Sequence, residues 1–142
     1  MGINVLIVDD SALIRQVVRK VVKQTGIQPD SFFEAGNGRE ALDIIAKNRV
    51  DLVLSDINMP RMDGLQMLLT LRRMKDKESL PVIVVSTEGS EDTMREAMKL
   101  GATGYVLKPF TAEALAEQLR PLGFLTETPS EEDVDLSAPD AF

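Results

Sequence analysis

The sequence places chemically reactive side chains at the ends of the apolar runs that we predict to be strands. These terminal residues are Asp9 and Asp10, Asp56, Ser86 and Thr87, and Lys108. In an open α/β sheet the carboxyl ends of the strands meet at one edge, and ligands bind there. We therefore expect carboxylates, hydroxyls and one ammonium group to share a single site.

If the first and third predicted strands are neighbours, three carboxylates meet at one edge, where they repel one another and destabilise the fold unless positive charge enters. A magnesium ion (Mg2+), which prefers oxygen ligands, and Lys108 can both supply that charge. A carboxylate neutralised in this way can attack a phosphoryl group and form an acyl phosphate. Asp56 is the expected nucleophile, and the hydroxyl of Ser86 or of Thr87 is expected to hydrogen-bond to an oxygen-rich group beside it.

A structural role is the more common explanation for each of these residues taken alone. An aspartate at a strand end usually caps a turn or a helix, although Ser11 can also cap the helix that follows Asp9 and Asp10. Lys108 alone would be surface charge. Their combination at the strand ends, rather than any single residue, favours a phosphoryl site.

The elements that must position these residues alternate along the chain. The predicted strands are 3–8, 31–35, 50–55, 82–86 and 104–108, and the helical segments are 9–26, 38–48, 63–75, 90–100 and 111–119. Strands that are apolar throughout, rather than alternating, indicate a sheet covered on both faces. The order predicts an open parallel α/β sheet with right-handed crossovers.

Local signals mark several helix ends. Ser90 and Thr111 are expected N-caps, and Gly26 and Gly101 suit the residue after a helix, where a left-handed backbone is often needed. The first helix carries two adjacent apolar rows. These rows are Leu13, Val17 and Val21, and Ile14, Val18 and Val22.

Composition excludes several classes of function. The 142 residues have a formal net charge of -7, which argues against binding to nucleic acid or to an anionic membrane. The chain has no Cys and no His, so it holds no disulfide, no Ser-His-Asp triad, no His-ligated zinc and no phosphohistidine of its own. No apolar run approaches the roughly 18 residues of a membrane span, and no secretory signal is evident. We expect a cytoplasmic protein.

The character of the sequence changes near its C-terminal end. We predict one domain over residues 1–123, and we interpret residues 124–142, which are acidic and rich in Ser and Pro, as a mostly disordered tail. An inert linker is the more common role for such a tail than a ligand.

Four motifs resemble the response-regulator receiver domain. They are VDD at 8–10, SDINMPRMDG at 55–64, VVST at 84–87 and GYVLKPF at 104–110. The resemblance runs from about residue 3 to residue 123. It implies a flavodoxin-like (βα)5 fold, with a five-stranded parallel sheet in the order 2-1-3-4-5 and helices on both faces.

The resemblance also implies roles for individual residues. Asp56 would be the phospho-acceptor and a magnesium ligand. Asp10 would bind the metal directly, Asp9 would act mainly through water, and Asn58 would offer its backbone carbonyl. Lys108 would contact the phosphoryl group, and the peptide bond between Lys108 and Pro109 would be cis.

A switch is implied beside the acceptor. Ser86 would be the hydroxyl that follows the phosphoryl group, and Tyr105 the aromatic side chain whose rotamer changes with it. Asn58 and Glu88, each two residues after a site residue, are typical of the CheY-like chemotaxis subgroup, where they influence how fast phosphate leaves. Thr87 departs from the small residue usual after the switch hydroxyl, and it could share the role of Ser86.

The implied partners are proteins. A histidine kinase would donate the phosphoryl group, and in a chemotaxis pathway this donor would be the chemotaxis kinase. A phosphatase is a further implied partner. With no DNA-binding or enzymatic domain evident in the sequence, output would be through a flagellar motor switch protein or another protein target. The alternative is a phosphorelay intermediate or phosphate sink. Pro121, which shortens the last helix, and the acidic tail both depart from the family pattern.

Two other functional classes fit less well. A phosphohydrolase with an aspartyl nucleophile, as in the haloacid-dehalogenase group, needs a second Asp at the position of Asn58. A flavodoxin-like flavin carrier needs a Ser/Thr/Gly-rich loop after the first strand, where this chain has DDSAL. We therefore expect a protein that accepts phosphate and assists its own phosphorylation and dephosphorylation, rather than an enzyme acting on a separate substrate.

Overall fold

The computed structural model describes residues 2–125 and forms a parallel sheet of five strands with five helices. The strands are β1 (Ile3–Val8), β2 (Pro29–Ala35), β3 (Leu52–Ser55), β4 (Val82–Ser86) and β5 (Gly104–Leu107), in the order β2-β1-β3-β4-β5. The helices are α1 (Ala12–Gln24), α2 (Gly38–Lys47), α3 (Gly64–Arg72), α4 (Glu91–Lys99) and α5 (Ala112–Leu119), with a short 3-10 helix at Arg120–Leu122. The predicted flavodoxin-like (βα)5 fold is confirmed.

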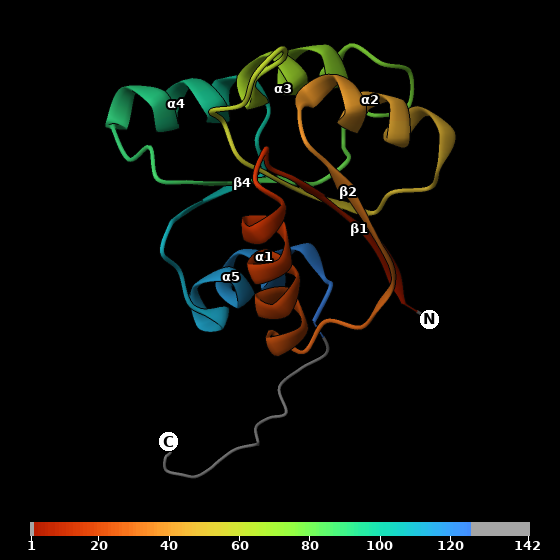
Figure 1. Cartoon of the computed structure of the whole chain (residues 1–142), viewed down its shortest axis with the longest axis vertical. Coiled ribbons are helices and arrows are strands. Elements are labelled where there is room, and N and C mark those ends of the chain that lie inside the picture. Colours follow the sequence, from red (N-terminus) through yellow and green to blue (C-terminus); the bar gives the residue numbers. More distant parts are fainter. Residues whose placement is uncertain (1, 126–142) are drawn as a thin grey trace, which may run out of the picture.

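Helices cover both faces of the sheet. Figure 1 shows α2, α3 and α4 on one face and α1 and α5 on the other. Successive residues of a strand point to opposite faces, so Val5 and Ile7 of β1 pack under α1 and α5, whereas Leu6 and Val8 pack under α2 and α3. The sheet is therefore buried on both sides, as its apolar strands predict.

The helix ends follow the capping signals in the sequence. The side chains of Ser11, Ser90 and Thr111 accept hydrogen bonds from backbone N–H groups in the first turns of α1, α4 and α5. Gly26 and Gly101 have φ values of 97° and 106°, which an L-residue adopts only with strain. The predicted caps and helix ends are confirmed.

Three strand boundaries differ from the predicted ones. β5 ends at Leu107, one residue before the predicted end at Lys108. β2 begins at Pro29, two residues early, because β2 is an edge strand and the first residue of an edge strand tolerates proline. β3 begins at Leu52, two residues late, because the Asp51 carboxylate accepts a hydrogen bond from the Asn4 backbone N–H at 2.8 Å before regular pairing starts.

One of the two apolar rows on α1 faces the core, whereas the other reaches the core only at Val21. Val18 and Val22 are buried, whereas Leu13 is 69% exposed and Val17 is 48% exposed.

The described chain ends at Phe124 and Leu125, which pack against the core beneath α1 and α5. The rest of the predicted tail, 126–142, lies outside the described residues, so the boundary at residue 123 stays a prediction. Within residues 2–125, no helix is both long and apolar enough to cross a membrane.

Candidate functional site

Three aspartates meet at the carboxyl edge of the sheet because β1 and β3 are neighbours. Val8 and Ser55 are paired residues of these strands, so Asp9, Asp10 and Asp56 follow directly from adjacent strand ends. A carboxylate oxygen from each lies within 4.8 Å of the others. Asp9 is buried, Asp56 is half-buried and Asp10 is exposed, which leaves the cluster open to solvent on one side.

Lys108 brings positive charge to this cluster from the end of β5. Its Nζ lies 2.8 Å from Oδ2 of Asp9 and 3.4 Å from Oδ2 of Asp56. The Lys108 backbone N–H donates to the Ser86 carbonyl at 2.8 Å, which fixes where the side chain starts. The predicted cis peptide bond between Lys108 and Pro109 is present.

Backbone contacts hold Asp56 at the end of β3. Its N–H donates to the Val8 carbonyl at 2.9 Å, and the Ile57 N–H donates to Oδ1 of Asp56 at 2.7 Å. Gly64, the first residue of α3, presses against this loop, since a Cβ there would lie 2.2 Å from the Asp56 carbonyl oxygen. Gly64 was not predicted as a site residue, although the glycine that begins a helix after SDINMPRMD is a visible signal.

Asp9 is held by two groups that leave Oδ2 to Lys108. Its Oδ1 accepts a hydrogen bond from the Ser11 N–H at 2.9 Å, and its carbonyl accepts one from Nη1 of Arg15 at 2.6 Å. Arg15 in turn pairs with Glu34 of β2 at 2.8 Å. No sequence signal singles out Arg15, because an arginine on an amphipathic helix is ordinarily a solvated residue.

The predicted switch residues form a chain of contacts next to the carboxylates. Ser86 is fully buried, and its Oγ accepts a hydrogen bond from the Glu88 N–H at 3.1 Å. The Tyr105 hydroxyl donates to the Glu88 carbonyl at 2.5 Å. Burial, followed by the Glu88 carboxylate, raises the pKa of Tyr105 above its ordinary value. Glu88 therefore contacts both Ser86 and Tyr105, and the switch role of these residues stays a prediction.

The remaining two predicted site residues are exposed on loops. Thr87 lines a hollow beside Lys108, on the side of the site that faces α1. Asn58 follows the buried Ile57 in the loop after Asp56. Their roles in the site stay predictions.

The donor set fits a hard divalent cation. Asp9, Asp10 and Asp56 offer carboxylate oxygens, and such ligands together with water suit Mg2+. One oxygen of Asp9 and one oxygen of Asp56 form ion pairs with Lys108, so one cation already balances part of the negative charge. A metal ion would complete that balance.

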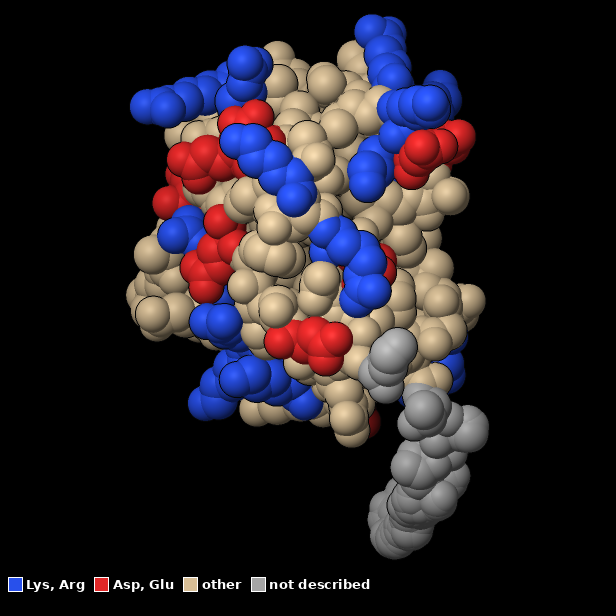
Figure 2. All heavy atoms as spheres, turned by 90° about the vertical axis from the view of Figure 1, so that its right-hand side faces the viewer, with Lys and Arg blue, Asp and Glu red and all other residues tan. Residues whose placement is uncertain are grey.

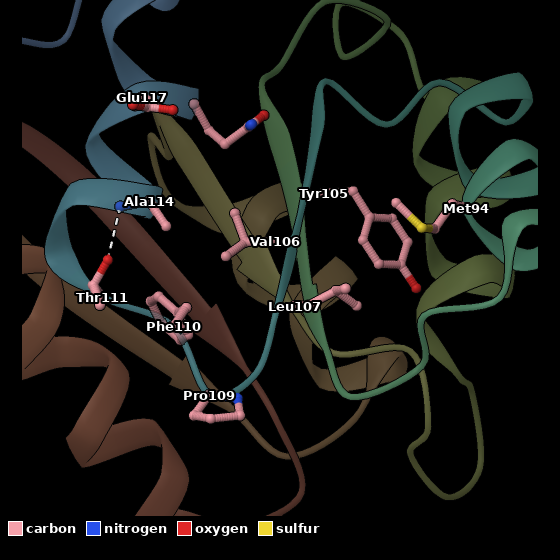
Figure 3. Close-up of a pocket in the computed structure, with 10 residues that line it drawn as sticks. Met94, Tyr105, Val106, Leu107, Pro109, Phe110, Thr111, Ala114 and Glu117 are labelled. Carbon is pink, nitrogen blue, oxygen red and sulfur yellow. Dashed lines mark hydrogen bonds between the residues drawn. The ribbon is translucent and has the colours of Figure 1, made fainter.

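A second hollow lies on the other side of β5, between α4 and α5. It has a volume of about 490 Å³, and Met94, Tyr105, Phe110 and Ala114 are among the residues that line it. Figure 3 shows Tyr105 pointing towards Met94, with Phe110 and Ala114 on the opposite side of the hollow. Tyr105 therefore lines this hollow and also contacts Glu88 beside the site.

Comparisons with known proteins agree with the geometry. Residues 5–120 match the family model of the response regulator receiver domain. A chemotaxis protein CheY homolog of Campylobacter jejuni subsp. jejuni is 38% identical over 117 residues, which make up 82% of this chain and 88% of that protein. The solved structure of Vibrio cholerae chemotaxis protein CheY4 has 36% identity and a TM-score of 0.75, over 85% of this chain and 98% of that one. The Francisella response regulator 1452 receiver domain has 32% identity and a TM-score of 0.72, over 85% and 96% of the two chains.

Proposed function

Because the chain belongs to the response regulator receiver domain family and is CheY-like, we propose that it receives a phosphoryl group on Asp56 and signals through phosphorylation-dependent protein binding. One observation carries the proposal. The ammonium group of Lys108 contacts both Asp9 and Asp56 within a cluster of three carboxylates at the carboxyl edge of the sheet. This arrangement gathers positive charge around a carboxylate that solvent can reach.

Asp9, Asp10 and Asp56 would hold Mg2+, with the backbone carbonyl of Asn58 as a further ligand. When bound, the ion neutralises charge that builds up on the phosphoryl oxygens. The protein's own residues supply the other requirements. Asp9 keeps Lys108 oriented, and the Ile57 N–H fixes the Asp56 carboxylate by holding Oδ1.

In the phosphoryl transfer, an Asp56 carboxylate oxygen forms a bond to phosphorus while the bond from phosphorus to the donor's imidazole nitrogen breaks. The leaving imidazole then takes up a proton. The donor histidine belongs to another protein, because this chain contains none. A small acyl phosphate is an alternative donor, with a carboxylate as the leaving group. Lys108 is placed to pair with the transferred group, since its Nζ is already 3.4 Å from the acceptor.

We propose that Ser86 binds a phosphoryl oxygen and moves with it, with the exposed Thr87 as a second hydroxyl beside it. The contact from Ser86 to Glu88 and on to Tyr105 passes this movement to the hollow between α4 and α5. Asn58 and Glu88 flank the site and set the rate at which phosphate is lost. The surface around the hollow between α4 and α5 has two conformational states and is the output. Phosphorylation shifts the populations of these states.

The proposed setting is cytoplasmic chemotaxis signalling. A chemotaxis histidine kinase donates phosphate, a phosphatase removes it, and a flagellar motor switch protein or another protein target binds the phosphorylated form. The names of similar proteins support chemotaxis. Met94 and Met98 of α4 offer an adaptable apolar surface for such a partner.

Intact-mass spectrometry tests the acceptor role. The protein is incubated with acetyl phosphate and Mg2+, and we expect a mass gain of one phosphoryl group that Asp56→Asn abolishes. Asp92→Asn is the matched control, because Asp92 is an exposed carboxylate on α4, away from the cluster. Equal labelling of Asp56→Asn and the unsubstituted protein would refute the proposal.

A lysate capture experiment tests the output. Protein loaded with beryllofluoride and Mg2+, a stand-in for the phosphorylated state, is compared with Asp56→Asn. We expect motor switch proteins to be retained only by the loaded protein. Capture of a kinase or phosphotransfer protein alone, and equally by both samples, would instead show a phosphorelay intermediate or a phosphate sink.

A further inference from the structure

Helix α1 presents an apolar surface that the described domain leaves uncovered. Leu13 and Val17 are 69% and 48% exposed, and they lie one helical turn apart. Beside Val17 a hollow of about 300 Å³ opens towards Thr87, Lys108 and Phe110. The apolar face of α1 thus runs up to the edge of the phosphoryl site.

The same helix is strongly basic. Residues 12–24 contain Arg15, Arg19, Lys20 and Lys23 and no acidic residue. Glu34 of β2 pairs with both arginines, whereas Lys20 and Lys23 are exposed. Figure 2, which looks onto the β2 side, shows Lys and Arg side chains at the lower end of the domain, where the described chain also finishes in Figure 1, as well as at its upper end.

The segment 126–142 has the complementary composition. It holds six of the 23 acidic residues and none of the 16 basic ones, so it carries a formal charge of −6 while the remainder of the chain carries −1. Val134, Leu136 and Phe142 are interspersed with these acids. Acidic and apolar side chains in one segment match a surface that is both basic and apolar.

The segment also starts on the correct face. Phe124 and Leu125 pack against the same core as Val21 of α1, so the chain leaves the domain beside α1 and α5. Its 17 residues can extend about 3.3 Å each, or about 56 Å in all. The 13 residues of α1 span only about 20 Å. The segment is therefore long enough to follow the whole helix.

Charge disfavours the other exposed apolar surface, between α4 and α5. That surface carries Glu91, Asp92, Glu96, Glu113 and Glu117 against Arg95 and Lys99. An acidic segment would meet net repulsion there, whereas α1 itself carries four basic residues and no acidic one. Of the two surfaces, α1 is the one that the segment fits.

We propose that residues 126–142 bind in cis along α1, across Leu13, Val17 and Lys20, and cover the hollow beside Thr87 and Lys108. Binding is driven by apolar burial and by attraction between the acidic residues and the exposed lysines. The covered face is then closed to other proteins until a competitor or high salt displaces the segment. The binding itself does not rest on the proposed function.

Paramagnetic relaxation tests the binding in the full-length chain. The chain has no Cys, so Ser137→Cys gives a single attachment point for a nitroxide label. At low salt we expect the amide signals of Leu13, Val17 and Lys20 to lose at least half of their intensity, while Met98 on α4 keeps its intensity. Raising the salt to about 1 M, where charges are screened beyond about 3 Å, should restore the α1 signals.

Charge reversal supplies a matched pair of variants. Lys20→Glu should remove the broadening on α1, whereas Lys99→Glu on α4 should leave it unchanged, since both lysines are exposed and reversal changes the total charge equally. Three results would overturn the proposal: broadening centred on Met98, broadening spread evenly over the domain, or no broadening of any signal in residues 2–125. A mixed sample separates binding in cis from binding between copies. It contains isotope-labelled protein without the nitroxide and nitroxide-labelled protein without the isotope. Equal broadening in this mixture would show binding between copies and would also overturn the proposal.

These measurements need no phosphorylation, so their failure is separate from failure of the receiver function.

Discussion

Lys108 contacts two carboxylates that are mostly buried, although Asp56 keeps some exposure to solvent. The Asp9 and Asp56 side chains are 5% and 14% exposed, and both contact the same ammonium group. Buried carboxylates without a cation are costly, because desolvation and mutual repulsion act in the same direction. The lysine therefore serves the resting fold as well as the proposed phosphoryl chemistry.

We predict that Lys108→Met lowers the free energy of unfolding by about 3 kcal/mol in a metal-free buffer, because it leaves two charges uncompensated. Added Mg2+ should recover part of this loss, since it supplies charge to the same carboxylates. Urea unfolding with EDTA and with Mg2+ measures both values. Lys99→Met is the control on an exposed lysine. An equal effect of the two substitutions on the free energy of unfolding would show that the charge of Lys108 does not stabilise the fold.

Tyr105 is the chain's single tyrosine, and the chain has no tryptophan, so phenolate absorbance reports this residue alone. Burial and the Glu88 carboxylate raise its pKa, so we predict a titration midpoint above pH 10. Glu88→Gln should lower the midpoint while keeping the backbone carbonyl that accepts the hydroxyl proton.

The sign of the linked stability follows from the raised pKa. The folded state keeps the phenol proton longer than the unfolded state, so this contribution is complete below about pH 10 and is lost as pH rises through the folded-state pKa. A midpoint at or below pH 10, with no change in Glu88→Gln, would contradict the contacts described for Tyr105.

Among the elements, the start of α3 sets the position of the acceptor loop. Gly64 touches the Asp56 carbonyl so closely that Gly64→Ala must push the loop or the helix away. We predict a loss of about 2 kcal/mol in stability, which is typical of overpacking, and slower labelling by acetyl phosphate.

Gly36→Ala is the matched control. A Cβ at Gly36 would have its closest neighbour at 3.6 Å, an ordinary contact. Thermal unfolding and labelling rates compare the two variants. Unchanged values for Gly64→Ala would show that the loop is not fixed by α3.

Most elements and the main site could be predicted because their signals are local. Apolar runs mark the strands, Ser90 and Thr111 mark helix starts, and Asp56 at a strand end gains meaning from Lys108 at another. The missed features depend on tertiary neighbours. Arg15 gained its contact with Asp9 only from the way α1 crosses β1 and β2, and the exposure of Leu13 depended on which apolar row of α1 met the sheet.

At the scale of the domain, the sheet connects the charged edge to the hollow between α4 and α5. Tyr105 belongs to β5, touches Glu88 after β4, and lines the hollow between α4 and α5. Only the folded state brings the three candidate metal ligands together, because 46 residues separate Asp9 from Asp56 along the chain.

We therefore predict that Mg2+ stabilises the whole domain by linkage. A ligand that binds only the folded state adds about 2.7 kcal/mol at a hundredfold excess over its Kd. Asp10→Asn should raise stability in EDTA by relieving repulsion and should also lose most of the Mg2+ increment. Calorimetry at matched ionic strength, with NaCl in place of MgCl₂, separates binding from screening. An equal gain from NaCl would argue against a metal site.

The central claim is that Asp56 carries the phosphoryl group, and chemical mapping of that group tests it most directly. After incubation with acetyl phosphate and Mg2+, borohydride reduces an aspartyl phosphate to homoserine. The tryptic peptide between Arg49 and Arg61 contains both Asp51 and Asp56, so fragmentation compares two aspartates in one molecule. We predict homoserine at position 56 and unmodified aspartate at position 51. Homoserine at position 51, at 9 or at 10, with none at 56, would contradict the assignment of the acceptor.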